Sequence, residues 1–231
     1  NSRVGIQTTN LSTYPSATQP RIRYNHITIM APNSTLVPYR GIYARNCSNL
    51  LIEQNTVTRG PVPNNHPPIY GIWVENSSLT EVNGNFVNRM GDGIYMKSLC
   101  PASRLTCNQL FRNYNGFFMD MVTIGDQFGV NQPNDNMYSN SPTGPHSINK
   151  DIDGAVPAIT NWYYRTSQAW FVPIGVPFFP FFPLASGSSS ACNPILPPIA
   201  PPLRSGMWSA IVQNQISFPQ FDQESKWLSK K

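Results

Sequence analysis

The chain has few charged residues: Asp, Glu, Lys and Arg make up 12% of its 231 positions. Residues that favour helices are also scarce, whereas Asn, Ser, Thr, Pro and Gly are abundant, so the composition excludes a helical bundle. The formal net charge is +5, and the basic residues are scattered and do not form a stripe interleaved with aromatics. Since such a stripe is typical of nucleic-acid binding, we predict no nucleic-acid partner.

Long apolar runs are missing as well. The most apolar stretch, Val176 to Leu184, is too short to cross a membrane and is interrupted by Pro177, Pro180 and Pro183. We therefore predict no membrane span. The first residues lack a basic region followed by an apolar one, so we expect that any signal peptide has already been removed.

Cysteine is rare, with four residues in the chain and no CxxC pair. We accordingly predict no metal site and no cofactor. Cys100 and Cys107 flank a short loop, and a disulfide between them would suit an oxidising compartment. Two buried thiols are the alternative. We expect Cys47 to lie inside a turn of the fold, and Cys192 to lie in the tail, where it could pair with a cysteine of another chain.

The chain does contain a repeat. Glycine, an apolar residue and an aromatic occur in a row four times, beginning at Gly41, Gly71, Gly93 and Gly116. Intervals of about 22 to 30 residues are typical of a solenoid. The residues after each glycine alternate with a period of two, which indicates a strand. The positions predicted to point inward are all apolar, namely Ile42, Ala44, Ile72, Val74, Ile94, Met96, Phe117 and Met119.

The opposite face of these strands carries two columns of like residues. One column is aromatic and contains Tyr43, Trp73, Tyr95 and Phe118. The other alternates in charge and contains Arg45, Glu75, Lys97 and Asp120. In-register parallel neighbours of both kinds stabilise a stack, each pair by about 0.2 to 1 kcal/mol.

An asparagine follows each repeated glycine at a nearly constant offset, and we predict that these side chains form a ladder. Its members are Asn55, Asn85, Asn108 and Asn131, with Asn25 one coil earlier. With Gly5 opening the first coil, the pattern over residues 5 to 140 resembles the right-handed parallel β-helix superfamily, which includes pectate lyases, polygalacturonases and many bacterial surface proteins. We predict an all-β fold, a right-handed parallel β-helix of about five coils over residues 1–140.

The remainder of the chain is different in composition. We predict an irregular proline- and aromatic-rich strap over residues 141–205 and a short, partly helical segment over residues 206–231. The aromatics of Phe178 to Phe182 need cover, from the β-helix flank or from a protein partner. Nothing before Gly5 is long enough to cap the first coil, so we expect a fragment of a larger protein or a partner at that end.

The tail also resembles the proline-rich joint that follows β-helix domains in Bacteroidota proteins exported by the type 9 secretion system. That resemblance implies secretion to the cell surface. No sorting domain follows the joint in this sequence.

The resemblance to pectin-degrading enzymes implies catalytic residues that are not found here. Polygalacturonase-like enzymes use clustered aspartates with a His and an Arg-Ile-Lys motif, and pectate lyases use calcium-binding acids with an arginine base. Among the acidic residues, those on or beside the corresponding strand are Glu75, Asp92, Asp120 and Asp126. Glu75 and Asp120 would lie about 9.6 Å apart, near the upper limit for an inverting glycosidase pair. However, Lys97 between them should keep both carboxylates ionised, so we favour a structural charge ladder over a catalytic pair.

Two features could bind a ligand. The aromatic column could form a platform for sugar rings, unless the strap covers it. Two neighbouring coils also carry a longer loop before their glycine strand, and these loops would form a ledge. The ledge would offer Tyr39, Arg40, Arg59, Asn65, His66 and Tyr70.

These observations predict a secreted or cell-surface β-helix protein that is structural or adhesive, that binds polysaccharide through the ledge and aromatic column, and that is not an enzyme. One alternative is a polysaccharide-degrading enzyme, a glycoside hydrolase or polysaccharide lyase, with Glu75 and Asp120 as its acid and base. The other is a secreted client or subunit of an outer-membrane complex, with a partner chain against the strap or the ends of the β-helix.

Overall fold

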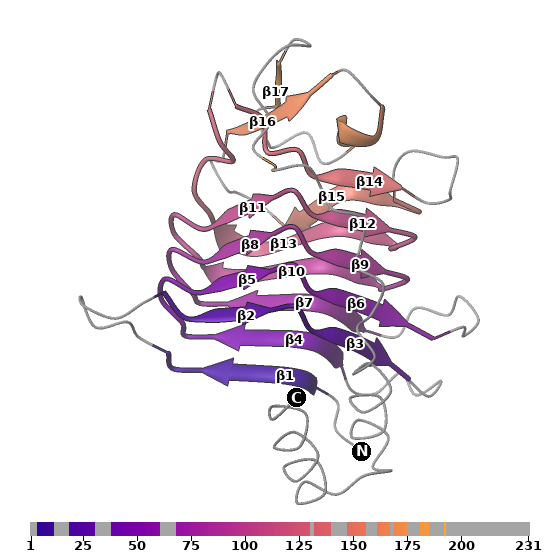
Figure 1. Ribbon diagram of the computed structural model, residues 1–231. Helices are drawn as coiled ribbons and strands as arrows, with labels where there is room; N and C mark the ends of the chain where they lie inside the picture. The colour runs from indigo at the N-terminus through magenta and orange to yellow at the C-terminus, as the bar shows by residue number, and fades with distance from the viewer. Residues whose placement is uncertain are drawn as a thin grey trace, which may run out of the picture.

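The computed structural model describes residues 4–11, 19–30, 38–60, 68–129, 132–139, 147–155, 161–166, 169–174, 181–184 and 192. Three parallel sheets run side by side along a single stack (Figure 1). The first sheet has six strands in the order β1 (Val4–Thr9), β4 (Tyr39–Arg45), β7 (Ile69–Glu75), β10 (Asp92–Leu99), β13 (Asn115–Thr123) and β15 (Lys150–Ala155).

The other two long sheets are built from the shorter strands. The second sheet holds β2 (Arg21–Arg23), β5 (Leu51–Glu53), β8 (Glu81–Asn83) and β11 (Arg104–Thr106). The third holds β3 (His26–Ile29), β6 (Thr56–Arg59), β9 (Phe86–Asn88), β12 (Gln109–Phe111) and β14 (Met137–Ser139). Each of the first four coils therefore contributes one strand to each sheet in turn, which is the architecture that the repeat predicts.

The core is a set of superimposed apolar columns. Every residue that the alternation places inward is at most 2% exposed. In the first sheet the register aligns Ile6, Ile42, Ile72, Ile94, Phe117 and Ile152 in one column. The prediction of a β-helix with a stacked apolar interior is confirmed.

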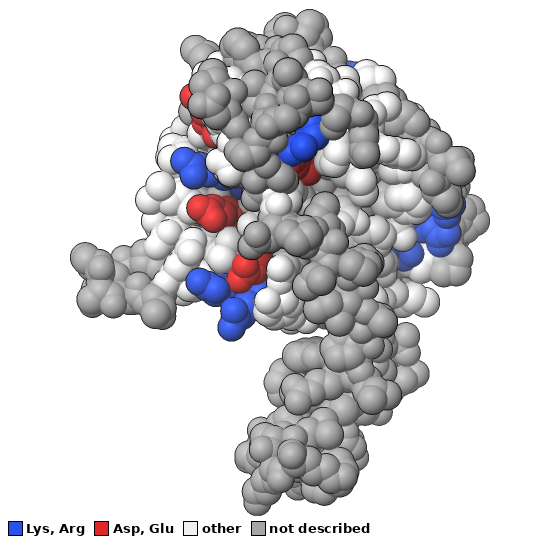
Figure 2. Space-filling model, turned by 45° about the horizontal axis from the view of Figure 1, so that its top comes forward, with Lys and Arg blue, Asp and Glu red and all other residues white. Residues whose placement is uncertain are grey.

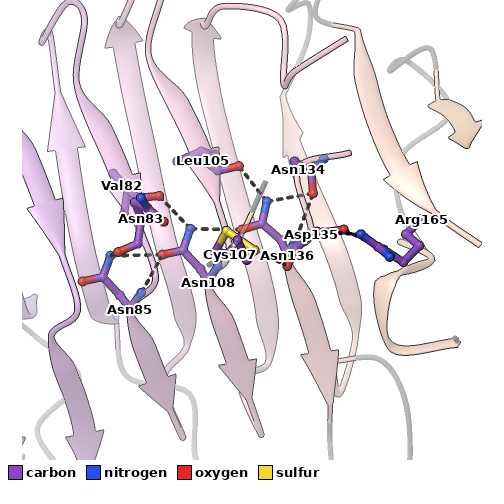
Figure 3. Close-up of a disulfide and its surroundings, with 11 residues drawn as sticks. Val82, Asn83, Asn85, Leu105, Cys107, Asn108, Asn134, Asp135, Asn136 and Arg165 are labelled. Carbon is purple, nitrogen blue, oxygen red and sulfur yellow. Dashed lines mark hydrogen bonds and ion pairs between the residues drawn. A yellow bond between two sulfur atoms is a disulfide. The ribbon is translucent and has the colours of Figure 1, made fainter. Parts of the chain in front are cut away.

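An asparagine ladder joins the second and third sheets (Figure 3). The backbone N–H and side-chain Nδ2 of Asn55 both donate to Oδ1 of Asn85, at 3.0 and 3.0 Å, and Asn85 and Asn108 repeat the arrangement one coil on. Each Nδ2 also donates to a backbone carbonyl of the preceding coil, as from Asn85 to Ile52 at 2.9 Å. The ladder thus satisfies polar groups in the interior of the corner.

The last step of the predicted ladder is wrong. Asn108 is followed by Asn136, to whose Oδ1 it donates at 3.0 Å, and Asn131 lies outside the described residues. The chain takes 20 positions from Gly116 to Asn136, against 14 or 15 from the earlier glycines to their ladder asparagines, so counting a constant offset from Gly116 stops five positions too early. Tyr138 of β14 consequently takes the inward place beside Leu110.

The β-helix also continues beyond the predicted boundary at residue 140. Strand β15 pairs with β13 through residue 155 and adds a sixth strand to the first sheet. The glycine of the repeat is replaced at that coil by Asp151, whose carbonyl faces Gly116. The strand was missed because it lacks the glycine–apolar–aromatic signal.

The C-terminal end of the stack is closed by β16 (Trp162–Arg165) and β17 (Phe181–Leu184), which pair in parallel. Trp162 is fully buried and lies 5.5 Å from the Phe117 ring. The Arg165 guanidinium makes two hydrogen bonds of 3.1 Å to the Asp135 carboxylate. A 3-10 turn, η1 (Ala169–Phe171), lies near β14.

A disulfide joins Cys107 to Cys192, 85 positions later, and attaches the tail to a corner of the stack. The predicted Cys100–Cys107 pair is therefore wrong. Cys100 is a buried free thiol on the other side of β11, where its Sγ contacts the Lys97 carbonyl at 3.4 Å, and burial raises its pKa to about 11. Cys47 is likewise buried and free, as its turn position predicts.

The proline- and aromatic-rich segment is only partly described. Residues 181–184 form β17 and pair with β16 despite Pro183, although they lie in the segment predicted to be irregular. An edge strand can accommodate a proline because only one side of it is paired. Phe178 and the predicted helical segment 206–231 lie outside the described residues. Within the described ranges, no helix has the length and apolarity needed to cross a membrane.

Candidate functional site

The outward face of the six-stranded sheet brings together most of the predicted site residues in three columns. The edge column contains Arg40, Tyr70, Asp92, Asn115 and Lys150. The aromatic column contains Tyr43, Trp73, Tyr95 and Phe118, followed by Asp153. The charge column contains Arg45, Glu75, Lys97 and Asp120.

The aromatic column is in register as predicted, but its rings pack mainly against each other. Trp73 lies 5.7 Å from Tyr43 and 4.6 Å from Tyr95, and Tyr95 stacks on Phe118 at 5.6 Å. The guanidinium of Arg40 lies over the Trp73 ring at 4.1 Å. Tyr43, Trp73 and Tyr95 are only 7 to 8% exposed. The column is therefore a packed cluster, and little flat ring surface faces the solvent.

The charge column forms the predicted alternating ladder. Arg45 lies 3.9 Å from Glu75, and Lys97 lies 3.7 Å from Asp120. The Tyr43 hydroxyl donates to Glu75 at 2.7 Å and the Tyr95 hydroxyl to Asp120 at 2.6 Å. Burial and then these hydrogen bonds raise the pKa of both tyrosines. Figure 2 shows acidic and basic side chains lying close together on a mainly uncharged surface.

Asp92 stands apart from the charge ladder. It begins β10 and accepts a hydrogen bond on Oδ1 from Asn115 at 2.8 Å, while Asn149 donates to Asn115 at 2.9 Å. Burial raises the pKa of Asp92 to about 6; the Asn115 amide lowers it, and the charge of Asp153 raises it further. The pKa of Tyr70, the next residue in the edge column, is raised by burial and then by the negative charge of Asp92.

Comparison with known families agrees with this architecture. Residues 1–122 match the family model described as the right handed beta helix region, which is more than half of the chain. The chain belongs to the right-handed β-helix family. Neither the curated proteins nor the solved structures gave a significant match to this β-helix.

The remaining predicted site residues of this right-handed β-helix are partly placed. Tyr39 and Arg40 begin β4 and pair with Ile69 and Tyr70 of β7, whereas Arg59 ends β6 in the third sheet, where burial lowers its pKa. Asn65 and His66 lie outside the described residues, so the ledge they would complete stays a prediction. In the part of the β-helix that the structure describes, no three His, Cys, Asp or Glu side chains are grouped to hold a metal ion.

Sequence reasoning missed the polar group around Asp92. Asn149, Lys150 and Asp153 belong to the coil that follows residue 140, and Lys150 donates to Asp153 at 2.8 Å. The rest of the edge column could have been predicted by counting from the repeated glycines. The residue directly before each glycine belongs to this column, namely Arg40, Tyr70, Asp92 and Asn115.

The raised pKa of Asp92 predicts a pH dependence of stability. Folding raises this pKa from 3.8 to about 6, so the native state binds the proton more tightly than the unfolded state. The contribution of Asp92 to the free energy of unfolding therefore falls as pH rises between about 4 and 6. After allowing for partial exposure of the carboxyl, we expect the free energy of unfolding to fall by about 2 kcal/mol across this window. The measurement is the free energy of unfolding in urea for the parent chain and Asp92→Asn. The difference between the two should change with pH; a constant difference would contradict the assignment.

Proposed function

We propose that this protein is a non-catalytic, cell-surface or secreted β-helix that binds acidic polysaccharide along the outward face of its six-stranded sheet. The observation that carries the proposal is the charge column. The carboxylates of this column accept hydrogen bonds from neighbouring tyrosines, whereas its cationic side chains are more exposed to solvent.

The state of the two acidic residues supports a binding role over catalysis. Glu75 accepts from the Tyr43 hydroxyl and lies beside Arg45, and Asp120 accepts from Tyr95 and lies beside Lys97. An acid and base pair would need one carboxyl to donate a proton and the other to reach a water or sugar. Both carboxylates instead act as acceptors within the packed face.

The exposure of the basic residues supports an acidic ligand. The side chains of Arg45 and Lys97 are 54% and 40% exposed, against 19% and 27% for Glu75 and Asp120. Two coils separate Arg45 from Lys97, so the cations lie about 9.6 Å apart along a rigid face. A linear polymer with repeated carboxylate or sulfate groups could contact both of them.

Binding to immobilised polysaccharides tests this proposal. We expect Arg45→Ala with Lys97→Ala to weaken binding to an acidic polysaccharide such as polygalacturonate by about tenfold or more, since two charge-assisted contacts are lost. Binding of the parent chain should also weaken as salt is raised. The measurement is the dissociation constant by surface plasmon resonance.

Arg21→Ala with Arg23→Ala is the matched control, because it also removes two positive charges and both residues lie in β2. Arg21 lies in the second sheet and contacts Glu53 at 3.5 Å, so its removal changes net charge without touching the outward face of the first sheet. We expect it to have little effect. Equal weakening by both variants would indicate a nonspecific effect of net charge, and failure to bind any acidic glycan would overturn the proposal.

A polysaccharide-degrading enzyme is the second candidate, and Asp92 is the observation that favours it. A carboxyl with a pKa of about 6 can act as a general acid near neutral pH. Among the described residues, the hydrogen bond to Asp92 comes from Asn115 and not from the charge column. If polymer cleavage is found, Asp92→Asn should abolish it, whereas Glu75→Gln and Asp120→Asn should retain it. If Glu75→Gln and Asp120→Asn lose cleavage activity and Asp92→Asn keeps it, the catalytic carboxyls belong to the charge column.

A further inference from the structure

Three arginines lie on adjacent coils at the point where strands of the third sheet end. Arg59, Arg89 and Arg112 each stand four positions after an asparagine of the ladder. The register of β6 with β9 and of β9 with β12 places these positions side by side, about 4.8 Å apart along the stack. We call the three residues the arginine column. Figure 2 shows basic side chains gathered at the side of the stack where these strands end in Figure 1, with no acidic side chain visible beside them.

The arginine column has no acidic partner in the described part of the chain. The ion pairs found there all use other basic residues. The five strands of the third sheet contain no Asp or Glu, and the sequence has none at residues 60–68 or 140–146, which follow β6 and β14. Asp92, three positions after Arg89, belongs to the first sheet, where it accepts from Asn115.

Neither the turn nor the stacking favours arginine at these positions. Arg89 and Arg112 have φ angles of 63° and 52°, in the left-handed region where Gly and Asn cost least. Like charges opposite each other on adjacent strands are destabilising. Nε of Arg59 is buried and has no hydrogen-bond partner among the residues that the structure describes. An anion held between the guanidinium groups would offset the repulsion and satisfy buried N–H groups.

The geometry of the arginine column selects the kind of anion. Each guanidinium presents a planar fork of N–H donors that matches an oxyanion. A phosphate or sulfate group offers at least three acceptor oxygens, one for each arginine, whereas a carboxylate offers two. Arg89 is exposed and Arg112 half-buried, so both are open to solvent. The Arg112 guanidinium lies 5.1 Å from the centre of the Phe111 ring, and stacking of its face leaves its N–H edge free to donate.

We propose that the arginine column is an anion site that binds a phosphate or sulfate group, with Arg89 and Arg112 as the main donors and Arg59 as the third. The group is either a free ion or an ester on a larger molecule. This site is on the third sheet, whereas the charge column is on the first, so the inference does not depend on the polysaccharide binding proposed above.

Isothermal titration calorimetry of the full chain with inorganic phosphate, and separately with inorganic sulfate, tests the proposal at constant ionic strength. We expect a dissociation constant of about 1 mM for at least one of the two anions. Arg89→Asn with Arg112→Asn should weaken binding by about tenfold or more, because two charge-assisted donors are lost. Asn tolerates the left-handed conformation, so without anion this variant should unfold at a urea concentration no lower than the parent chain.

Arg23→Asn with Arg104→Asn is the matched control. It removes the same charge from the second sheet, where the two guanidinium groups lie over the rings of Tyr24 and Phe128. We expect this control to change the dissociation constant by less than about twofold.

Dextran sulfate, with uncharged dextran beside it, distinguishes the two sources of the group. Tighter binding per sulfate than with inorganic sulfate, lost in Arg89→Asn with Arg112→Asn, identifies an ester on a polymer, and equal binding identifies a free ion. Polygalacturonate binding is expected to depend on Arg45 and Lys97, so it can fail without affecting this result.

Three results would overturn the proposal. Neither inorganic anion might be bound at concentrations up to about 10 mM, which the parent titration would show directly. The two double variants might weaken binding equally, which would indicate an effect of net charge alone. Loss of phosphate and sulfate binding in Arg45→Ala with Lys97→Ala, but not in Arg89→Asn with Arg112→Asn, would place the anion on the charge column.

Discussion

Replacing Asn85 with Ala should lower the free energy of unfolding by about 4 kcal/mol. Asn85 is fully buried at the centre of the ladder, and its side chain accepts from Asn55 and donates to Asn108 and to the Ile52 carbonyl. The substitution leaves the Asn55 backbone N–H and the Ile52 carbonyl without partners inside the corner. Each orphaned buried group costs about 1–3 kcal/mol, which accounts for the expected loss. Urea unfolding followed by circular dichroism measures it.

Asn88→Ala is the control for this substitution. Asn88 lies three positions away on β9, and its buried Oδ1 has no hydrogen-bond partner among the residues that the structure describes. The same atoms are removed, but no ladder bond is lost, so we expect a change below about 1 kcal/mol. An Asn85 variant that unfolds no more easily than the Asn88 variant would show that the ladder is not a source of stability.

Gly93→Ala should cost about 3 kcal/mol because neighbouring coils leave no room for a methyl group. A Cβ at Gly93 would lie 2.6 Å from the Gly116 carbonyl oxygen and 2.8 Å from Nδ2 of Asn113. Ordinary contacts between such atoms are about 3.5 Å. Neither neighbour can move freely, since the first is backbone of β13 and the second is held by hydrogen bonds to Met90 and Val87. Urea denaturation measures this loss as a lower unfolding midpoint, and we expect the m value to stay unchanged.

Gly129→Ala provides the comparison for the glycine substitution. A Cβ at Gly129 meets no atom of the described residues within 4 Å, so the substitution should leave stability nearly unchanged. If both alanine variants unfold at the parent urea concentration, the repeated glycines are not required for close coil stacking.

The repeat predicted the fold because a solenoid places each residue beside its counterpart in the next coil. Tyr43, Trp73 and Tyr95 could be aligned by counting alone, and their register in the first sheet is the predicted one. The same holds for the alternating charges of Arg45 and Glu75. A short, regular spacing in the sequence was sufficient for these residues, since their neighbours in space are one repeat away.

Counting failed where the spacing within a coil changed. The stretch from Gly116 to Asn136 is longer than those from the earlier glycines to their ladder asparagines, so the ladder position moved. Strand β15 carried no recognisable signal because Asp151 replaces the glycine of the repeat. The burial of the aromatic rings was also not readable from the repeat. Alternation assigns them to the outward face, but Arg40 and Tyr70, from the preceding column, pack over that face.

The amino-acid pattern was therefore enough to establish the parallel stack, its inward apolar columns and its outward charge ladder, because all three depend on contacts between equivalent positions. The pairing of Cys107 with Cys192 and the raised pKa of Asp92 depend on contacts between positions that are not equivalent. Such contacts follow from how the last coil and the tail fold back on the stack, and no periodicity encodes them.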